Sequence, residues 1–296
     1  MEQAATIQKK KNKNSMGREA WRRFRKRPPA VVGLCYFAII IFLVIFSNVF
    51  WNYQTQAIEQ SAATRLIWPN AEHWFGTDAF GRDLLVRIAF GARNTLLLGA
   101  GATVCAAIIG MVLGSTAAFF GGKYDTLIMR VCDVMMSVPG ILLCLAVIAG
   151  LGTGIPQLIV AMTIGGFAGF TRVFRSAVLG IVNQEYIEAS RAMGGRNFYI
   201  ITRHVIPNTI GTLLIQLTMN MASNMMVGAA LSFLGMGAKI PTPEWGQMLK
   251  DGMNNIRTHS YLVTIPGVVL ALTALSIMLI GDGLRDALDP KLKGRV

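Results

Sequence analysis

Charged residues are scarce in this chain of 296 residues: Asp, Glu, Lys and Arg together make up 15 % of it, and hydrophobic residues make up 53 %. Soluble globular proteins contain about 25 % charged residues, so this composition is typical of a protein that lies largely in lipid. Acidic residues are the rarer sign, with 15 Asp and Glu against 28 Lys and Arg. Soluble nucleic-acid-binding proteins share such an excess, so the distribution of charge decides between the two classes.

Residues that ligate metals or carry out catalysis are also sparse. The three histidines lie far apart in the sequence and form no zinc or catalytic pattern. The phosphate-binding pattern Gly-x-x-x-x-Gly-Lys-Ser/Thr is missing, because Tyr124 follows Gly122-Lys123. The cysteines show no CxxC spacing and are interpreted as small hydrophobic residues. We therefore predict no catalytic residue, cofactor or metal in this chain, and we expect ATP and Mg²⁺ to bind another chain.

Uncharged runs of spanning length recur along the chain, and a transmembrane helix needs about 20 apolar residues. The run from 134 to 171 has 38 residues, which is too long for one helix, and turn formers between Gly150 and Pro156 divide it. The sequence therefore predicts an all-α integral membrane protein with six transmembrane helices. The runs are 31–50, 94–120, 134–171, 204–238 and 258–281.

Lys and Arg are concentrated on one side of this predicted topology, and in multi-pass proteins the cytoplasmic loops hold the excess. The side of the two termini holds 21 of these residues, and the opposite side holds seven. Both termini are therefore expected in the cytoplasm. The predicted parts are a basic cytoplasmic tail 1–30, a first transmembrane helix 31–50, an extracytoplasmic segment 51–93, a five-helix core 94–283 with a cytoplasmic loop 172–207, and a cytoplasmic tail 284–296.

The first span follows a basic tail and could instead be a cleaved signal peptide. Its apolar run is too long for that, and no small-x-small cleavage site follows Phe50, so we interpret it as a retained helix. The tail has two basic runs, from Lys9 to Lys13 and from Arg22 to Arg27. Such a tail can bind anionic lipid headgroups at its membrane-proximal end, or it can serve only as a signal for membrane topology.

The loop 172–207 has the pattern of a helical elbow. Asn183 is a good N-cap, and Glu185 falls in the first turn, where the helix dipole favours a carboxylate. The Gly194-Gly195 pair permits the positive backbone dihedrals that end a helix. A second helix can then run through Pro207 into the fifth span. The first helix carries the apolar Tyr186, Ile187, Ala189, Ala192 and Met193 and the charged Glu185, Glu188 and Arg191.

A short helix of this composition can dock in a groove of a soluble partner, with apolar anchors and a charged rim. Motion of that partner would reach the fifth span through the second helix of the elbow. The alternative is a surface helix that only connects two spans.

Polar residues recur every four positions in the fifth span, which places successive members on one helical face. A polar stripe in a span must face protein or water, because lipid would leave its amides unpaired. The stripe can line a translocation cavity, or it can bond one helix to another. Its members are Asn208, Thr212, Gln216, Asn220 and Asn224.

The second span carries a ridge of small residues at the same spacing, which permits close approach of another helix. The neighbour can belong to this chain or to a partner. The ridge consists of Ala102, Ala106, Gly110, Gly114 and Ala118.

Several segments resemble those of a known family. Glu188-Ala189-Ser190, then Gly194, then Val205-Ile206-Pro207 resemble the cytoplasmic coupling loop of ABC importer permeases. The family pattern is Glu-Ala-Ala, a Gly six positions after the Glu, and hydrophobic-x-Leu-Pro, so Ser190 and Ile206 depart from it. Other segments resemble the oligopeptide, dipeptide and nickel permeases, in particular the subunit with a short outer loop. These segments lie within 73–83, 121–133, 231–237, 243–246 and 281–290.

The resemblance implies a type I ABC importer permease fold in a bacterial cell membrane. In that family a second, related permease completes the pathway, two cytoplasmic ATPases dock beneath, and an extracytoplasmic binding protein delivers the substrate. Glu188, Ala189, Gly194 and Pro207 are expected to couple the chain to the ATPases by this match. Glu185, Tyr186, Arg191 and Gly195 are added from their positions in the elbow. Candidate pathway residues are Thr212, Gln216, Asn220 and Asn224.

Two features belong to the predicted outer side. Thr77 or Asp78 can cap a helix in which Asp83 and Arg87 are spaced as an i,i+4 ion pair. Trp245 is expected as an aromatic anchor at the outer membrane interface, or in contact with a docked binding protein.

The sequence leaves the substrate open, and the importer function must be weighed against two other functions, a channel and a membrane-embedded enzyme. Within the family, the substrate can be a di- or oligopeptide, which we favour, or nickel or another small solute. A channel would need a selectivity element, and the turn from Gly150 to Pro156 is too short for one. A membrane-embedded enzyme would need reactive residues, and the predicted spans contain no Asp, Glu, Lys or Arg in their interiors. We therefore interpret the chain as a transport subunit without enzymatic activity.

Overall fold

The computed structural model describes residues 16–288, and the regular elements within this range are all helices. This confirms the predicted all-α class. The outer parts of the two predicted tails, 1–15 and 289–296, lie outside the described residues. The helices are α2 (Met16–Arg25), α3 (Pro28–Phe50), α4 (Leu84–Phe120), α5 (Gly122–Ser137), α6 (Gly140–Leu151), α7 (Ile155–Leu179), α8 (Glu185–Ala192), α9 (Asn197–Ile200), α10 (Ile206–Phe233), α11 (Trp245–Met253) and α12 (Tyr261–Leu288), with shorter helical turns at Tyr53–Ile58, Ala62–Thr64 and Ile201–Val205.

Four of these helices, α3, α4, α7 and α12, are long and apolar enough to cross a membrane. The helices α5 and α6 meet this condition only as a pair, and they are bent by 90° relative to each other. Helix α10 is long enough, with 28 residues, but it contains three Asn and one Gln and is not among these four. The chain is therefore a multi-pass membrane protein, and the count of six transmembrane helices stays a prediction for α10 and the bent pair.

The third predicted span is not a straight helix. Helix α5 ends at Ser137, Val138 has an extended backbone with φ −94° and ψ 131°, and α6 begins at Gly140. Pro139 accounts for the break, because proline disfavours helical backbone at the residue before it and offers no N–H to the helix. The uncharged run therefore did not predict where the helix begins, because a proline interrupts the run near its start.

Helix α4 begins ten residues before the predicted second span and has 37 residues, which corresponds to about 55 Å. Its N-cap is Asp83, whose carboxylate accepts a hydrogen bond from the Val86 N–H at 3.0 Å. The prediction of a cap at Thr77 or Asp78 was therefore wrong. The helix extends beyond the hydrocarbon thickness of about 30 Å, so its first turns can carry Arg87 and Arg93 outside the lipid.

The small-residue ridge of α4 packs against α7 of the same chain. A Cβ atom added to Gly110 would lie 2.4 Å from the Phe170 Cβ, and one added to Gly114 would lie 2.4 Å from the Thr171 carbonyl oxygen. Neither position has room for a side chain. The question that the sequence left open is thereby answered, because the helix that approaches this ridge is α7.

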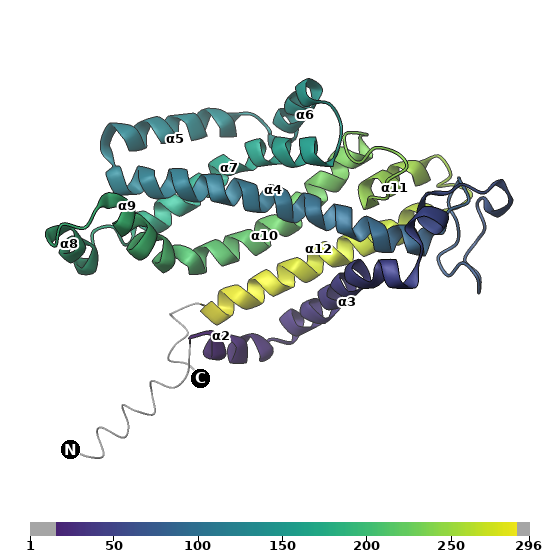
Figure 1. Ribbon diagram of the computed structural model, residues 1–296, viewed down its shortest axis with the longest axis horizontal. Coiled ribbons are helices and arrows are strands. Elements are labelled where there is room, and N and C mark those ends of the chain that lie inside the picture. Colours follow the sequence, from purple (N-terminus) through teal and green to yellow (C-terminus); the bar gives the residue numbers. More distant parts are fainter. Residues whose placement is uncertain (1–15, 289–296) are drawn as a thin grey trace, which may run out of the picture.

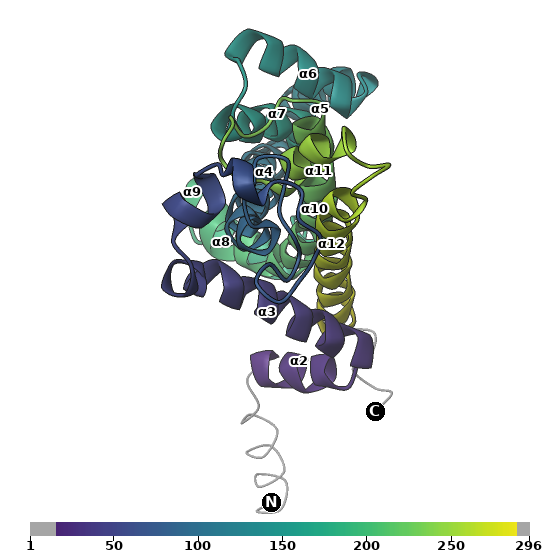
Figure 2. The same cartoon turned by 90° about the vertical axis from the view of Figure 1, so that its right-hand side faces the viewer.

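The helices form an elongated bundle (Figure 1). Helices α5 and α6 lie on one flank and α3 on the opposite flank, with α4, α7, α10 and α12 between them (Figures 1 and 2). The elbow formed by α8 and α9 lies at the same end of the bundle as α2 and the last turn of α12 (Figure 1). The segment between α3 and α4 lies at the other end together with α11 (Figure 1).

The contact between α4 and α7 generates a stability prediction. Replacing Gly110 with Ala forces a Cβ into the Phe170 contact and is expected to lower the free energy of unfolding by about 1–3 kcal/mol. Gly150→Ala is the matched control, because a Cβ added to that helical glycine meets no atom within 4 Å. Thermal unfolding of the purified variants in detergent measures the difference, and equal stability of the two variants would contradict the proposed close contact.

Candidate functional site

The segment from Glu185 to Pro207 forms a helix, a tight turn and a second helix. Helix α8 ends at Ala192, with Met193 as its C-cap, and Gly194 has a φ of +79°, a backbone conformation that disfavours residues with a side chain. The Gly195 N–H donates to the Ser190 carbonyl oxygen at 2.9 Å, which satisfies one of the last carbonyls of α8. Helix α9 then continues through a wide helical turn, 201–205, into α10 without a break. Pro207 lies in the first turn of α10, where proline is tolerated.

One detail of the elbow differs from expectation. The N-cap of α8 is Gln184 rather than Asn183, and its side chain makes no capping hydrogen bond. The first turn instead contains the carboxylates of Glu185 and Glu188, which favour the positive end of the helix dipole.

A small apolar core fixes the elbow to the bundle. Ile187 is fully buried and belongs to the same cluster as Phe119 from the end of α4 and Val178 from α7. The Arg191 guanidinium lies over the Phe119 ring, 4.7 Å from its centroid, in a cation–π contact. Ser190 is buried as well, and a Cβ on Gly195 would lie 2.7 Å from its carbonyl oxygen. Ile187 thus faces the bundle, whereas Arg191 stacks on Phe119 and is still exposed.

The opposite face of the elbow is open. Glu185, Glu188 and Ala189 are exposed, and so is Tyr186 at the edge of this face. Three apolar side chains of the elbow are also exposed, namely Met193 at 83 %, Phe198 at 78 % and Tyr199 at 53 %. The last two were not among the predicted site residues, although two adjacent aromatic residues in a basic loop were a usable signal.

The polar stripe on α10 divides into two parts. The Asn224 Nδ2 donates to the Thr103 hydroxyl of α4 at 2.9 Å, so this amide bonds helix to helix. Among the described residues, the Asn220 Nδ2 donates only within its own helix, to the Gln216 carbonyl oxygen at 2.9 Å. Thr212 is exposed, and Gln216 and Asn220 are half-buried. Their predicted role in lining a pathway stays a prediction, and Asn224 has a structural partner.

At the other end of the bundle, buried charges join three segments. The Asp78 carboxylate accepts from the Arg82 Nε at 2.7 Å and lies 3.5 Å from the Arg87 Nε. The Arg87 Nη1 also donates to the Ala57 carbonyl oxygen at 2.7 Å. The predicted Asp83–Arg87 pair is therefore wrong, because Asp83 caps α4 and contacts the His73 Nδ1 at 2.8 Å.

Comparison with known proteins assigns this arrangement to a family. Residues 106–294 match the family described as binding-protein-dependent transport system inner membrane component, and residues 15–69 match the N-terminal TM domain of oligopeptide transport permease C. The chain belongs to the binding-protein-dependent transport permeases. It is 40 % identical over 276 residues to the dipeptide transport system permease protein DppC of Alkalihalophilus pseudofirmus, with 93 % of this chain and 90 % of the relative covered.

A second relative and a solved structure agree with this assignment. The permease is 38 % identical over 277 residues to the glutathione transport system permease protein GsiD of Escherichia coli, covering 93 % of this chain and 91 % of that protein. A crystal structure of inward facing conformations of the MetNI methionine ABC transporter aligns with a TM-score of 0.55 and 20 % identity, over 69 % of this chain and 97 % of that one. At this identity the match shows the fold, which is that of an ABC importer permease.

Family membership makes the chain the membrane permease subunit of an ABC importer, located in a bacterial inner membrane, with ATP hydrolysis in separate subunits. The two rival functions, channel and membrane-embedded enzyme, are thereby set aside. In the part of the permease that the structure describes, no group of three or more His, Cys, Asp and Glu side chains could hold a metal ion.

Trp245 of the permease is a core residue and not the predicted interface anchor. It is fully buried, and its Nε1 donates to the Ile88 carbonyl oxygen of α4 at 3.0 Å. The preceding Glu244 is also fully buried and caps α11, accepting from the Gly246 and Gln247 N–H groups at 2.9 Å each. Burial raises the pKa of the Glu244 carboxyl, against the hydrogen bonds that lower it, including one from the Thr95 hydroxyl.

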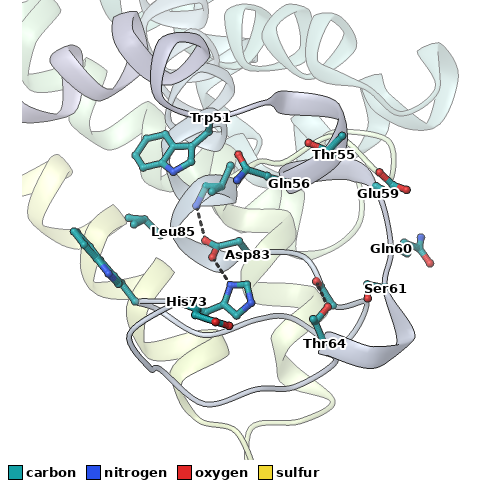
Figure 3. A pocket seen from close by; sticks show the side chains of 14 residues that line it. Trp51, Thr55, Gln56, Glu59, Gln60, Ser61, Thr64, His73, Asp83 and Leu85 are labelled. Atoms are coloured by element: carbon teal, nitrogen blue, oxygen red, sulfur yellow. Dashed lines mark hydrogen bonds and ion pairs between the residues drawn. The ribbon is translucent and has the colours of Figure 1, made fainter.

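The end of the permease that holds α11 also contains an open cavity of about 440 Å³ (Figure 3). Figure 3 shows the His73 and Asp83 side chains pointing toward each other in this cavity, with Trp51 on another wall. The carboxylates of Glu59 and Glu72 also line it. Neither a nucleophile with a base nor a metal set is present among these lining residues, so their arrangement gives no support to catalysis.

The buried charges generate a prediction for the end of the bundle that holds α11. Arg87→Met leaves the Asp78 carboxylate without one of its two cations and removes the donor to Ala57, so the free energy of unfolding should fall by about 3–5 kcal/mol. The control is Arg93→Met, which removes an exposed arginine from the same helix. Thermal unfolding in detergent and the rate of proteolysis within residues 59–75 measure the effect. Equal proteolysis of the two variants would show that Arg87 does not hold this segment.

Proposed function

We propose that this permease imports dipeptides or other short peptides. The observation that carries the proposal is the 40 % identity, over 93 % of the chain, to a permease named for dipeptides. A second relative is named for glutathione, which is itself a short peptide. Nickel and other small solutes are the alternative within the family, and neither name refers to a metal.

The complete importer would contain a second permease, two ATPases and a substrate-binding protein, as the family assignment implies. The elbow lies at the same end as α2 and the last turn of α12. Together with the excess of Lys and Arg on that side, this arrangement favours a cytoplasmic position for the elbow and both termini. The binding protein would then dock at the opposite end, where α11 and the segment before α4 lie.

The elbow would transmit motion of the ATPase to the pathway. Its open face offers exposed carboxylates and aromatic side chains to a groove in the ATPase, which suits helix-in-groove recognition. Its inner face is held to α4 and α7 through Ile187 and Phe119. The second helix of the elbow is continuous with α10, so a displacement of α8 would move α10 as well. Two positions of this unit would supply the two states that alternating access requires.

The packing of α10 supports such a movement. Its far half is embedded, with Ala222, Met225, Gly228, Ala229 and Leu231 all buried. Between residues 206 and 221, Thr209 is the one buried residue of the helix. The half next to the elbow is therefore open to a partner permease or to water, and it contains Thr212, Gln216 and Asn220. We infer that this open half lines the pathway, while Asn224 anchors the helix to α4.

The coupling role of the elbow predicts loss of uptake without loss of ATP hydrolysis. Gly194→Leu places a side chain at a φ of +79° and should displace the second helix, and Glu188→Ala removes an exposed carboxylate from the docking face. Each should lower uptake of a labelled dipeptide per ATP hydrolysed by about tenfold in the reconstituted importer. Unlabelled dipeptide should compete with uptake in the unaltered importer, and Ni²⁺ should not.

Gly122→Leu is the matched control for Gly194→Leu. Gly122 also has a positive φ, +58°, and open space around it, but it lies outside the elbow. The same backbone strain at that position should leave the ratio of uptake to hydrolysis unchanged. An unchanged ratio in both Gly194→Leu and Glu188→Ala would contradict coupling through the elbow, whereas competition by Ni²⁺ alone would contradict only the peptide substrate.

The divided stripe predicts opposite effects for two amides. Gln216→Leu should reduce uptake severalfold without lowering thermal stability, because Gln216 lies in the half of α10 that has few buried residues and its side chain makes no cross-helix hydrogen bond among the described residues. Asn224→Leu should lower stability by about 0.6–1.7 kcal/mol, because it removes the hydrogen bond to Thr103. Uptake and unfolding are measured on the same preparations. Normal uptake in both Gln216→Leu and Asn220→Leu would exclude a pathway role for the stripe.

A further inference from the structure

Helix α2 is attached to the bundle by one buried aromatic residue. Phe24 is 4 % exposed and packs with Ala30 of α3 and Ala287 of α12. The notch that receives its ring exists because residue 283 is a glycine: a Cβ there would lie 2.8 Å from the Phe24 ring and 2.5 Å from the Ala30 Cβ. Figures 1 and 2 show α2 beside the ends of α3 and α12. The position of α2 is thus fixed by packing.

Three arginines of α2 lie on the side of the helix opposite Phe24. At 100° per residue, Arg18, Arg22 and Arg25 fall within an arc of about 60° on the side away from Phe24. All three are exposed. From residue 16 to residue 27 the sequence contains six basic residues and one acidic residue. Among the ion pairs between described side chains, this stretch contributes only the one from Arg27 to Asp286, at 3.0 Å.

The neighbourhood of α2 marks the level of the membrane surface. Helix α3 begins at Pro28, three residues after α2 ends, and exposes Val32 at 65 % and Ile39 at 58 %, as a lipid-facing span does. Trp21 lies on α2 between the Phe24 side and the arginine side, is 51 % exposed and stacks on the Phe24 ring with centroids 5.7 Å apart. Tryptophan concentrates at the boundary between lipid and water. The arginines beside it are therefore at the depth of the headgroups.

We propose that α2 is an interfacial helix that binds anionic phospholipid headgroups through Arg18, Arg22 and Arg25. Arginine pairs with phosphate oxygens through two parallel N–H donors, and an amphipathic basic helix next to a span is attracted to an anionic leaflet. The Phe24 contact holds the three guanidinium groups in a fixed array, so selectivity depends on the position of the helix as well as on its charge.

Lipid selectivity of the full-length chain tests the proposal. The chain is reconstituted in phosphatidylcholine, and spin-labelled phosphatidylglycerol or phosphatidylcholine reports which lipid is immobilised at the protein surface. The unaltered chain should prefer phosphatidylglycerol by about threefold, and the preference should fall as KCl is raised. The variant Arg18→Gln/Arg22→Gln/Arg25→Gln should show a preference close to one. Phe24→Ala retains every charge and should also lose most of the preference.

The matched control removes three exposed basic residues at the end of the bundle that holds the elbow but outside α2, as Lys123→Gln/Arg196→Gln/Arg203→Gln. This variant should keep the preference of the unaltered chain. An equal loss in the control would overturn the proposal by assigning the effect to bulk charge. Full selectivity in the α2 triple variant would overturn it as well. A third outcome, no lipid selectivity in the unaltered chain, would also overturn the proposal. That outcome is expected if α2 serves only as a topology signal or docks on an acidic protein.

Discussion

The close approach of α4 and α7 at Gly110 and Gly114 is the contact on which the remainder of the bundle depends. Backbone atoms of α7 lie where the side chains of these residues would be, so the two helices are held at a separation that no larger residue permits. In lipid there is little hydrophobic drive between helices, and close packing of this kind supplies much of the attraction. The contact fixes the ends of both helices, and each end carries one part of the functional structure.

At one end, Phe119 of α4 and Val178 of α7 form part of the apolar cluster that holds the elbow. Ile187 of the elbow is buried in this cluster, and the Arg191 guanidinium stacks on the Phe119 ring. At the other end, the first turns of α4 hold Arg87, Ile88 and Thr95, which contact the buried Asp78, Trp245 and Glu244 respectively. A single rigid helix thus links the face that would meet the ATPase to the end that would meet the binding protein.

Much of this arrangement could be predicted from the sequence, because a lipid environment restricts where charged and polar residues can lie. Uncharged runs marked α3, α4, α7 and α12, the glycine pair marked the turn of the elbow, and the four-residue spacing of polar residues marked one face of α10. Two of the failures have a common cause, which is that one side chain can satisfy two local rules. Asp83 suits an i,i+4 pair and a helix cap, and capping prevailed because the Val86 N–H in the first turn of α4 has no carbonyl partner within the helix. A tryptophan at position 245 suits both an interface anchor and a core residue. The core role depends on the Ile88 carbonyl oxygen of α4, which accepts a hydrogen bond from the Trp245 Nε1, and the sequence does not reveal this contact.

The division of α10 into a buried half and an open half reflects two opposing requirements, packing within the bundle and freedom to move. A helix that must move cannot be buried along its whole length, and a helix that must stay in the bundle cannot be open along its whole length. In α10 the buried residues gather beyond Ala222, and the cross-helix hydrogen bond of Asn224 lies in that half. The polar residues nearer the elbow have no cross-helix hydrogen bond among the described residues. The fixed half can therefore act as a pivot, and the free half as the arm that follows the elbow.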